Sequence, residues 1–551
     1  MDTFIIIISN IFSTIFSIDF MQKMGWVVVP AIVAYGIYRF KKSELLQDGL
    51  YYWWGGGSRA NPTKRGYITG QTWTTVDKLR GISFKNKNEH KNCIKFDNFK
   101  FFPDYIEKTK MPKFKSKSAE SLEMNYPALS TAESVLFIGS AGSGKTIWHR
   151  GIIDQPWYTK LIIFSKKADA EIYFFRPGID FMLSPKIEDG AVHDILSEDI
   201  QYIGLYINTL MSAAIGEKKD YFSGSAMQRL QTMAERVKIK SVDNISTTRE
   251  KWVMFIEFIE GAIDESMTAE QKSEGDVMNT VKTVLELLYL VAYRVANGAT
   301  TFTAKDFFNS DIYGQKLFLT GTDKSLEAIL SASLAVLIKY QISMKDIVEW
   351  NPDYLVMYSM DEYLSLDKVI DSEILDEMTQ VGRSKGISSW KGIQRITAKD
   401  KEKTQALISS VHYIVIFSTV DPDTIKIIQS IASEIEYRYE DISTSKTAGR
   451  VTENKSIKIT KRQVLDDHPI KILQLHDYAH ITYLPKKDLL YMGSSPFVER
   501  KKREYINFKE IDMTEFARWK IARIDRNKAF EDAKKSLISE KTIEKIKTRN
   551  R

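Results

Sequence analysis

From residue 135 onward, short apolar runs alternate with longer stretches in which apolar residues recur at helical spacing. Apolar runs of this length, separated by helical patterns, are typical of buried parallel strands joined by crossover helices. We therefore predict an α/β fold with a parallel sheet at its centre. The predicted strands are Val135–Ile138, Leu161–Phe164, Tyr354–Ser359, Ile387–Ile393 and Tyr413–Phe417.

A long stretch between the second and third of these strands has a different pattern. Its apolar residues recur three or four positions apart, as they do on the buried face of a helix. We therefore predict an all-α domain inserted into the sheet domain. The predicted helices include Tyr202–Ile215, Ala226–Val237, Lys251–Ile263 and Val277–Val295.

Two apolar segments open the chain, Phe4–Phe20 and Gly25–Tyr38. Each lies near the lower limit of the about 17–25 residues that span a bilayer as a helix. Positive charge follows the second segment, at Arg39, Lys41 and Lys42, so the positive-inside rule places the rest of the chain in the cytoplasm. We predict a hairpin of two transmembrane spans. The alternative is one span with an interfacial segment.

The composition is that of a globular protein and excludes a largely disordered one, with 43% hydrophobic and 27% charged residues. A chain of 551 residues is too long for one ordinary core, so we expect about two or three folded units. The single cysteine, Cys93, excludes an intramolecular disulfide and fits a reducing compartment.

Positive charge is concentrated at the end of the chain. The net charge is +7, and the segment Arg500–Arg551 contains 17 Lys and Arg against nine Asp and Glu. The segment is poor in Gly and Pro and is predicted to be helical. Its basic residues could contact phosphates or an anionic membrane, or they could form the solvated face of a helix. The sequence leaves both readings open.

A complete G-x-x-x-x-G-K-[ST] motif follows the first predicted strand. Phosphate oxygens need several converging backbone N–H donors, and glycines let the backbone approach them closely. Lys145 would then reach the β- and γ-phosphates, and the Thr146 hydroxyl would bind Mg²⁺. The alternative is a glycine-rich turn without a ligand. The predicted nucleotide-binding residues are Gly139, Ser140, Ala141, Gly142, Ser143, Gly144, Lys145 and Thr146.

An acidic pair, Asp361 and Glu362, follows the third predicted strand. A P-loop ATPase needs a carboxylate at the end of a neighbouring strand, and Asp361 would hold the metal through water there. Glu362 would orient or deprotonate the attacking water. Taken alone, the pair is also compatible with an ordinary surface position.

Two further polar residues flank the fourth predicted strand. Gln394 follows that strand and could sense the γ-phosphate. Arg383 precedes it and could reach the nucleotide of a neighbouring subunit as an arginine finger. The alternative for Arg383 is an exposed structural arginine. Together these residues predict a chain that binds and hydrolyses ATP with Mg²⁺.

Taken together, these motifs resemble those of the type IV coupling proteins of bacterial conjugation, the TraD-like branch of the hexameric RecA-type DNA translocases. The resemblance covers most of residues 1–485. Beyond the P-loop, the stretches that carry it are Arg176–Asp180, Leu183–Pro185, Thr301–Phe307, Asp361–Lys368, Gly382–Gln394, Ser418–Pro422 and Val464–Asp466.

The resemblance implies a homohexamer in the bacterial inner membrane, with nucleotide between subunits. Such a ring would move single-stranded DNA, with its attached relaxase, to the proteins of a type IV secretion channel. The implied divisions are a membrane anchor at 1–42, a nucleotide-binding domain at 43–188 and 306–495, an all-α domain at 189–305 and a basic helical tail at 496–551.

Three features depart from the family pattern. The second predicted strand is followed by Ser165-Lys-Lys-Ala-Asp169 instead of the usual Asp-Pro or Asp-x-x-Gly turn. His193 replaces a usual tryptophan, and the loop between the two apolar segments is short. These departures concern the cargo and the periplasmic partner, and they leave the ATPase motifs intact. A coupling ATPase for protein effectors alone has the same motor motifs, and a non-enzymatic docking scaffold is the alternative of another class.

Overall fold

The computed structural model describes most of residues 133–494, with short gaps, together with 66–69, 93–101, 120–127, 509–525 and a few isolated positions. The chain divides into two compact units, one formed by 1–70 and 434–462 and the other by the remaining residues. The predicted membrane hairpin at 1–42 lies outside the described residues.

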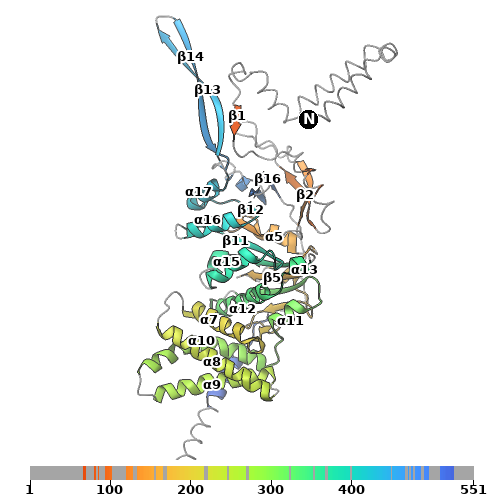
Figure 1. The fold of residues 1–551 in the computed structure, drawn as a ribbon, viewed down its shortest axis with the longest axis vertical. Helices are drawn as coiled ribbons and strands as arrows, with labels where there is room; N and C mark the ends of the chain where they lie inside the picture. The colour runs from red at the N-terminus through yellow and green to blue at the C-terminus, as the bar shows by residue number, and fades with distance from the viewer. Residues whose placement is uncertain are drawn as a thin grey trace, which may run out of the picture. The chain divides into compact units, whose positions relative to one another are not determined.

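The larger unit is built on an 11-stranded sheet with the order β3-β2-β16-β15-β12-β4-β11-β10-β5-β9-β6 (Figure 1). From β12 to β6 all neighbouring strands are parallel. These strands are β4 (Val135–Ile138), β5 (Lys160–Ser165), β6 (Phe181–Leu183), β9 (Gln315–Thr320), β10 (Val356–Met360), β11 (Ile387–Ile393) and β12 (Tyr413–Ile416).

All five predicted strands are confirmed, within two residues at each end. The strands β6 and β9 were not predicted, although β9 is completely buried between β5 and β6. Its first two residues, Gln315 and Lys316, are polar, which conceals the apolar run Leu317–Leu319. The two missed strands each offer only three consecutive apolar residues, Phe181–Leu183 and Leu317–Leu319, which is shorter than a typical buried-strand run.

The rest of the large sheet is antiparallel. β15 (Ala479–Leu484) pairs with β12 and with β16 (Leu489–Ser494). β2 (Cys93–Phe101) pairs with β16 and with β3 (Glu120–Pro127). The mixed sheet thus has a parallel part, on which the predicted site residues lie, and an antiparallel extension.

Helices cover both faces of the parallel part. On one face, Trp148 and Ile152 of α5 (Lys145–Ile153) pack with Phe137, Met357 and Trp390 of the strands. On the other face, the Tyr358 hydroxyl of β10 meets α12 (Lys324–Ser343), where it lies 2.8 Å from the Gln341 amide oxygen. The other helices of this unit that flank the strands are α6 (Glu171–Phe174), α11 (Ala304–Asn309), α13 (Ile347–Trp350), α14 (Tyr363–Leu366), α15 (Ser372–Val381), α16 (Lys401–Ser410) and α17 (Pro422–Ile431).

Four consecutive helices lie between β7 (Val192–His193) and β8 (Thr301–Phe302), which pair in parallel. Figure 1 shows them gathered below β5 and α12, at one end of the parallel part of the sheet. Each contains one of the predicted helices and extends beyond it, because apolar spacing marks the buried turns but not the polar terminal ones. They are α7 (Ile200–Ile215), α8 (Tyr221–Asn244), α9 (Thr248–Thr268) and α10 (Lys272–Ala296).

Within the described residues, one helix is long and apolar enough to cross a membrane. It is the segment Leu326–Ser343 of α12, and 78% of it is buried inside the protein. It packs against α7 and α15. This helix is therefore accounted for as a core helix of the larger unit.

Residues 513–525 form a helix that docks onto α9 and α10. The Trp519 ring meets Tyr289 and Tyr293 edge-on, with centroids 6.4 and 5.6 Å apart. Arg523 forms an ion pair of 3.3 Å with Glu260. Residues 513–525 of the basic tail are thus helical, and one face of this helix packs against α9 and α10.

The smaller unit contains a three-stranded sheet with the order β1-β13-β14. The long strands β13 (Glu434–Thr447) and β14 (Arg450–Gln463) are adjacent in the sequence and in the sheet. β1 (Gly66–Thr69) pairs antiparallel with the beginning of β13. Few apolar runs mark this region, and the sequence analysis did not predict these strands.

Candidate active site

The loop after β4 has the backbone of a phosphate-binding loop. Gly142 and Gly144 have φ angles of 77° and 102°, a region that L-residues with side chains rarely adopt. Gly139 passes close to β12, because a Cβ atom added there would lie 2.7 Å from the Phe417 Cβ. The backbone N–H of Ser140 donates to the Ser418 carbonyl at 3.0 Å and holds the start of the loop. Three glycines of the motif are therefore required by its geometry.

The loop leads directly into α5, which begins at Lys145. The positive end of the helix dipole and its unpaired N–H groups therefore point toward the loop, where they favour an anion. The Lys145 amine donates to the Gly139 carbonyl and, at 2.8 Å, to the Ser140 carbonyl. Burial lowers the pKa of Lys145 to about 8, and the nearby Asp361 and Glu362 oppose this effect. Thr146, next to it, is exposed.

Asp361 and Glu362 follow the last residue of β10, beside β5 and β11. The Asp361 backbone N–H donates to the Phe164 carbonyl at 3.1 Å. Gly392 of β11 allows the close approach, because a Cβ atom added there would lie 3.0 Å from Asp361 Oδ1. Glu362 has a φ of 58°, an unusual conformation for a residue with a long side chain, and such strain is concentrated at functional sites.

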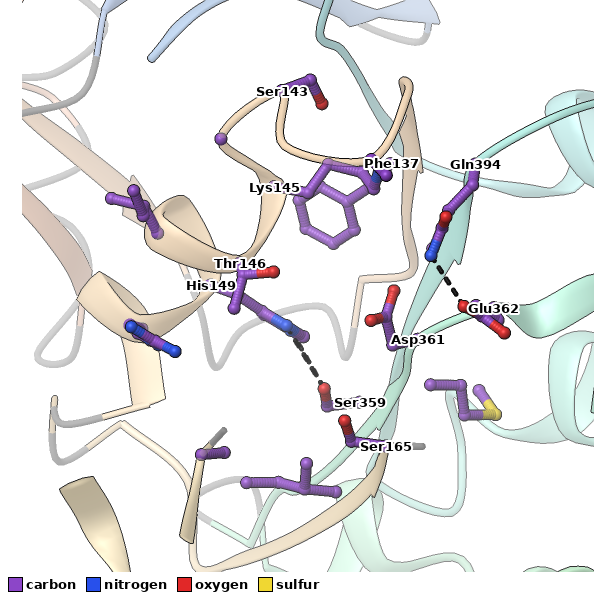
Figure 2. A pocket seen from close by; sticks show the side chains of 18 of the residues that line it. Phe137, Ser143, Lys145, Thr146, His149, Ser165, Ser359, Asp361, Glu362 and Gln394 are labelled. Atoms are coloured by element: carbon purple, nitrogen blue, oxygen red, sulfur yellow. Dashed lines mark hydrogen bonds between the residues drawn. The ribbon is translucent and has the colours of Figure 1, made fainter. Parts of the chain in front are cut away.

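Gln394 lies at the end of β11 and contacts the acidic pair directly. Its side-chain amide donates a hydrogen bond of 2.8 Å to Glu362 Oε1. Figure 2 shows Lys145 and Thr146 on one side of the pocket, and Asp361, Glu362 and Gln394 on the other. The fold therefore brings together residues from three separate parts of the sequence.

Sequence reasoning missed part of the pocket lining. His149, Ser165 and Ser359 also line the pocket, on the side away from the loop. His149 was detectable in principle, because it follows Lys145 by four residues on a helix and such residues share a face. Ser359 is the last residue but one of β10. Its sequence gives no sign of a site, because only the position of β10 in the sheet decides that its side chain faces the pocket.

Gly139 and Ser140, at the start of the loop, and Arg383 are the predicted site residues that do not line this pocket. Arg383 is the one that lies far from it in the fold. It lies in the turn between α15 and β11, at the start of the strand whose other end carries Gln394, and it is exposed. Because the nucleotide residues gather at the carboxyl ends of the strands, Arg383 lies at the opposite edge of the sheet. It is not among the residues that line the pocket of the same chain.

The residues in the pocket fit a nucleotide with Mg²⁺. The Thr146 hydroxyl and the Asp361 carboxylate are oxygen donors, the type that Mg²⁺ prefers. Across the part of the chain that the structure describes, no group of three or more His, Cys, Asp and Glu could hold a metal by itself. Mg²⁺ usually takes only one or two protein carboxylates and completes its shell with water and phosphate oxygens.

Comparison with known families gives one match that covers most of the chain. Residues 122–487 match the model of the type IV secretion-system coupling protein DNA-binding domain. No curated protein sequence matches the chain significantly.

The fold also resembles solved structures. The bacterial conjugative coupling protein TrwBdeltaN70, in an unbound monoclinic form, has 17% sequence identity and a TM-score of 0.55, with 81% of this chain and 96% of that chain covered. TrwB in complex with the non-hydrolysable ATP analogue ADPNP has 17% identity, a TM-score of 0.53 and coverage of 81% and 97%. TrwB in complex with ADP and Mg²⁺ has 17% identity, a TM-score of 0.52 and coverage of 81% and 98%.

Proposed function

Because the chain belongs to the type IV secretion-system coupling protein family, we propose that it hydrolyses ATP with Mg²⁺ to move single-stranded DNA toward a secretion channel. The observation that carries this proposal is one pocket lined by Lys145, Thr146, Asp361, Glu362 and Gln394. The similar fold of TrwB, which was solved with ADPNP and with ADP and Mg²⁺, supports the choice of nucleotide and metal.

Each residue in the pocket has a separate task. The loop Gly139–Thr146 binds the phosphates through its backbone N–H groups, and Lys145 neutralises the β- and γ-phosphates. Thr146 and, through water, Asp361 would hold Mg²⁺, which would neutralise the negative charge that develops on the phosphates. Glu362 orients the attacking water and accepts its proton.

Gln394 reports the state of the γ-phosphate. Its side-chain amide donates a hydrogen bond to the carboxylate of Glu362. When Glu362 turns toward the attacking water, this hydrogen bond must change, and the change reaches β11 and the segments that follow it. We assign to Gln394 the role of relaying the γ-phosphate state to the loops that would line the central channel of the proposed ring.

Arg383 acts on the nucleotide of a neighbouring subunit in this proposal. The pocket and Arg383 lie at opposite edges of one sheet. A head-to-tail contact between copies of the chain would therefore bring Arg383 to the neighbour's phosphates, and a closed ring of such contacts is a homohexamer in this proposal. The relaxase and the channel proteins are the partners that the family implies.

We propose the domain division that the sequence indicated. It consists of a membrane anchor at 1–42, a nucleotide-binding domain at 43–188 and 306–495, an all-α domain at 189–305 and a basic tail at 496–551. The anchor would hold the protein in the bacterial inner membrane with its bulk in the cytoplasm. Deletion of residues 1–42 and membrane fractionation test this assignment.

Two substitutions test the ATPase. Lys145→Ala should abolish nucleotide binding and turnover, because it removes the charge opposite the phosphates. Glu362→Gln should keep nucleotide affinity and lose hydrolysis, since the loss of one group of this kind costs about 3–4 kcal/mol of transition-state stabilisation. Steady-state ATPase assays with and without single-stranded DNA, together with nucleotide binding, make the measurement.

The exposed Lys401→Ala, on α16, is the control and should keep the wild-type rate. Equal ATPase rates in the wild type and both site variants would contradict the proposal. Turnover that DNA does not stimulate, with protein cargo recovered instead of DNA from the host, would favour a coupling ATPase for protein effectors.

A further inference from the structure

The ring of His149 lies at a junction between the elements that build the pocket. It projects from α5 one turn after Lys145 and lines the pocket below Thr146 (Figure 2). The roles assigned above to the loop, the acidic pair and Gln394 leave this side chain unused. Its contacts show what it can do.

Two strands hold the plane of the ring. The His149 ring stacks on Trp390 of β11, with centroids 5.8 Å apart and planes 10° apart. Phe137 of β4 lies against it at 5.5 Å with an interplanar angle of 49°. β11 ends next to Gln394, and β4 ends at the phosphate-binding loop. The ring orientation is therefore fixed relative to both.

A hydrogen bond connects the ring to the third strand. The Ser359 hydroxyl lies 3.1 Å from His149 Nε2, and Ser359 is only 1% exposed. Ser359 lies in β10, two residues before Asp361. Because Ser359 is buried, removing the His149 nitrogen leaves its hydroxyl without this partner in the interior. The bond links α5, which carries Thr146, to the strand that carries Asp361.

The ring is uncharged at neutral pH, since burial lowers the pKa of His149 to about 4. A neutral imidazole has one N–H donor and one acceptor nitrogen, so either tautomer can bond the Ser359 hydroxyl. An uncharged ring also adds no positive charge beside Lys145 and the metal site. The side chain is thus suited to hold position and not to bind phosphate.

We propose that His149 is a positioning residue that sets the separation of the Thr146 hydroxyl and the Asp361 carboxylate, and so the affinity for Mg²⁺ with nucleotide. This inference rests on the proposed function. Mg²⁺ requires nearly ideal octahedral geometry at about 2.0–2.1 Å, so small displacements of its ligands reduce binding. Groups that orient metal ligands typically change metal affinity by about 10–100-fold when they are removed.

Two variants break the link from opposite ends. His149→Phe keeps the stacking on Trp390 and removes the nitrogen atoms, and Ser359→Ala removes the hydroxyl. Each should raise the Mg²⁺ concentration for half-maximal binding of a fluorescent, non-hydrolysable ATP analogue by about tenfold, the lower end of that range. Binding without Mg²⁺ should stay unchanged. The double variant should behave like either single variant, because all three lack the same bond.

Two further variants separate positioning from packing. His149→Gln keeps an amide that can reach Ser359 and should recover part of the Mg²⁺ affinity. The matched control is His480→Phe, since His480 also lies among aromatic rings, Phe417 and Trp148, and also has a pKa lowered to about 4 by burial. It should leave the Mg²⁺ dependence as in the wild type. Thermal unfolding of each variant accompanies the titrations.

The outcomes are distinct. Equal Mg²⁺ dependence in the wild type, His149→Phe and Ser359→Ala would overturn the inference, as would an equal shift in His480→Phe. If the wild-type chain binds and hydrolyses ATP while the variants show no shift, this inference alone is wrong. If the wild-type chain neither binds nor hydrolyses ATP with Mg²⁺, the proposed function and this inference both fall.

Discussion

Lys145 holds its amine where burial lowers its pKa to about 8, while Asp361 and Glu362 favour the charged form. Below pH 8 the amine is protonated and attracts phosphate, and above pH 8 it loses its charge. Nucleotide affinity should therefore decrease as the pH rises through 8. If only the protonated form binds, the dissociation constant should be about fivefold higher at pH 9 than at pH 8. Titration with a fluorescent nucleotide between pH 7 and 9.5 measures this.

Lys145→Arg is the control for this pH dependence. A guanidinium stays charged over the whole range, so this variant should bind nucleotide with an affinity that does not change between pH 8 and 9. A wild-type dissociation constant that is equally flat would show that the Lys145 amine keeps its charge in the free protein.

At the scale of elements, the helix at 513–525 is held against α9 and α10 by aromatic packing and ion pairs, and not by its basic charge alone. The Trp519 ring packs on Tyr293, and the Lys520 amine lies 2.7 Å from the Glu286 carboxylate. Arg523 is 12% exposed at its side chain and pairs with Glu260, which is 10% exposed. Burial raises the pKa of Glu260, and Tyr289 and Arg523 oppose this effect. The Arg523–Glu260 pair is thus the most buried ion pair between the helix at 513–525 and the helices on which it packs.

Arg523→Ala should release this helix. The substitution leaves Glu260 buried without its cation, and breaking a buried pair in this way costs about 3–5 kcal/mol where desolvation is complete. We expect faster hydrogen exchange across residues 513–525 with little change in the sheet. The control is Arg518→Ala, on the exposed side of the same helix. Unchanged exchange in Arg523→Ala would show that the aromatic contacts alone hold the helix.

This docking also narrows the interpretation of the basic tail. Lys509, Lys520 and Arg523 pair with acidic residues of the chain. If the segment contacts phosphates, the contacts must come from its other basic residues. A truncation at Glu499 would remove the packed helix at 513–525 together with the other basic residues. Charge substitutions beyond residue 525 leave that helix in place, so they are the better probe of DNA affinity.

At the scale of the whole molecule, Arg383 tests the proposed ring, because in that proposal it acts only on the nucleotide of a neighbouring copy of the chain. An arginine finger supplied by a neighbour is worth about 10³–10⁵ in rate in well-studied phosphoryl-transfer enzymes. Arg383→Ala subunits should therefore bind ATP normally and fail to stimulate their neighbours. Doping wild-type protein with this variant should reduce ATPase activity more steeply than dilution with inactive protein.

Mixing two inactive variants tests the same arrangement from the other side. A ring that contains both Arg383→Ala and Glu362→Gln can pair an intact Arg383 with an intact Glu362 across one interface. Some activity should then return where neither variant alone has any. Wild-type ATPase rates in Arg383→Ala assembled on DNA would show that the residue is only structural.

The sequence by itself determined the parts of this protein that depend on local order. Four of the five predicted strands are largely apolar runs. The phosphate-binding loop is a contiguous motif whose glycines supply the positive φ angles at Gly142 and Gly144. Apolar periodicity also located α7 to α10, because a helix that buries one face repeats its apolar residues every three or four positions. In such cases the determining interactions lie within a few residues of one another.

Tertiary structure alone decided the rest. The hydrogen bond between Gln394 and Glu362 depends on β10 and β11 being neighbours, and the parallel register brings their carboxyl ends to one edge. The bond between His149 and Ser359 joins residues 210 positions apart. Strand order and register are set by the packing of the whole core, so no local pattern records which distant side chains will meet. The same reason explains why the docked tail helix and the buried polar start of β9 were found only in the folded chain.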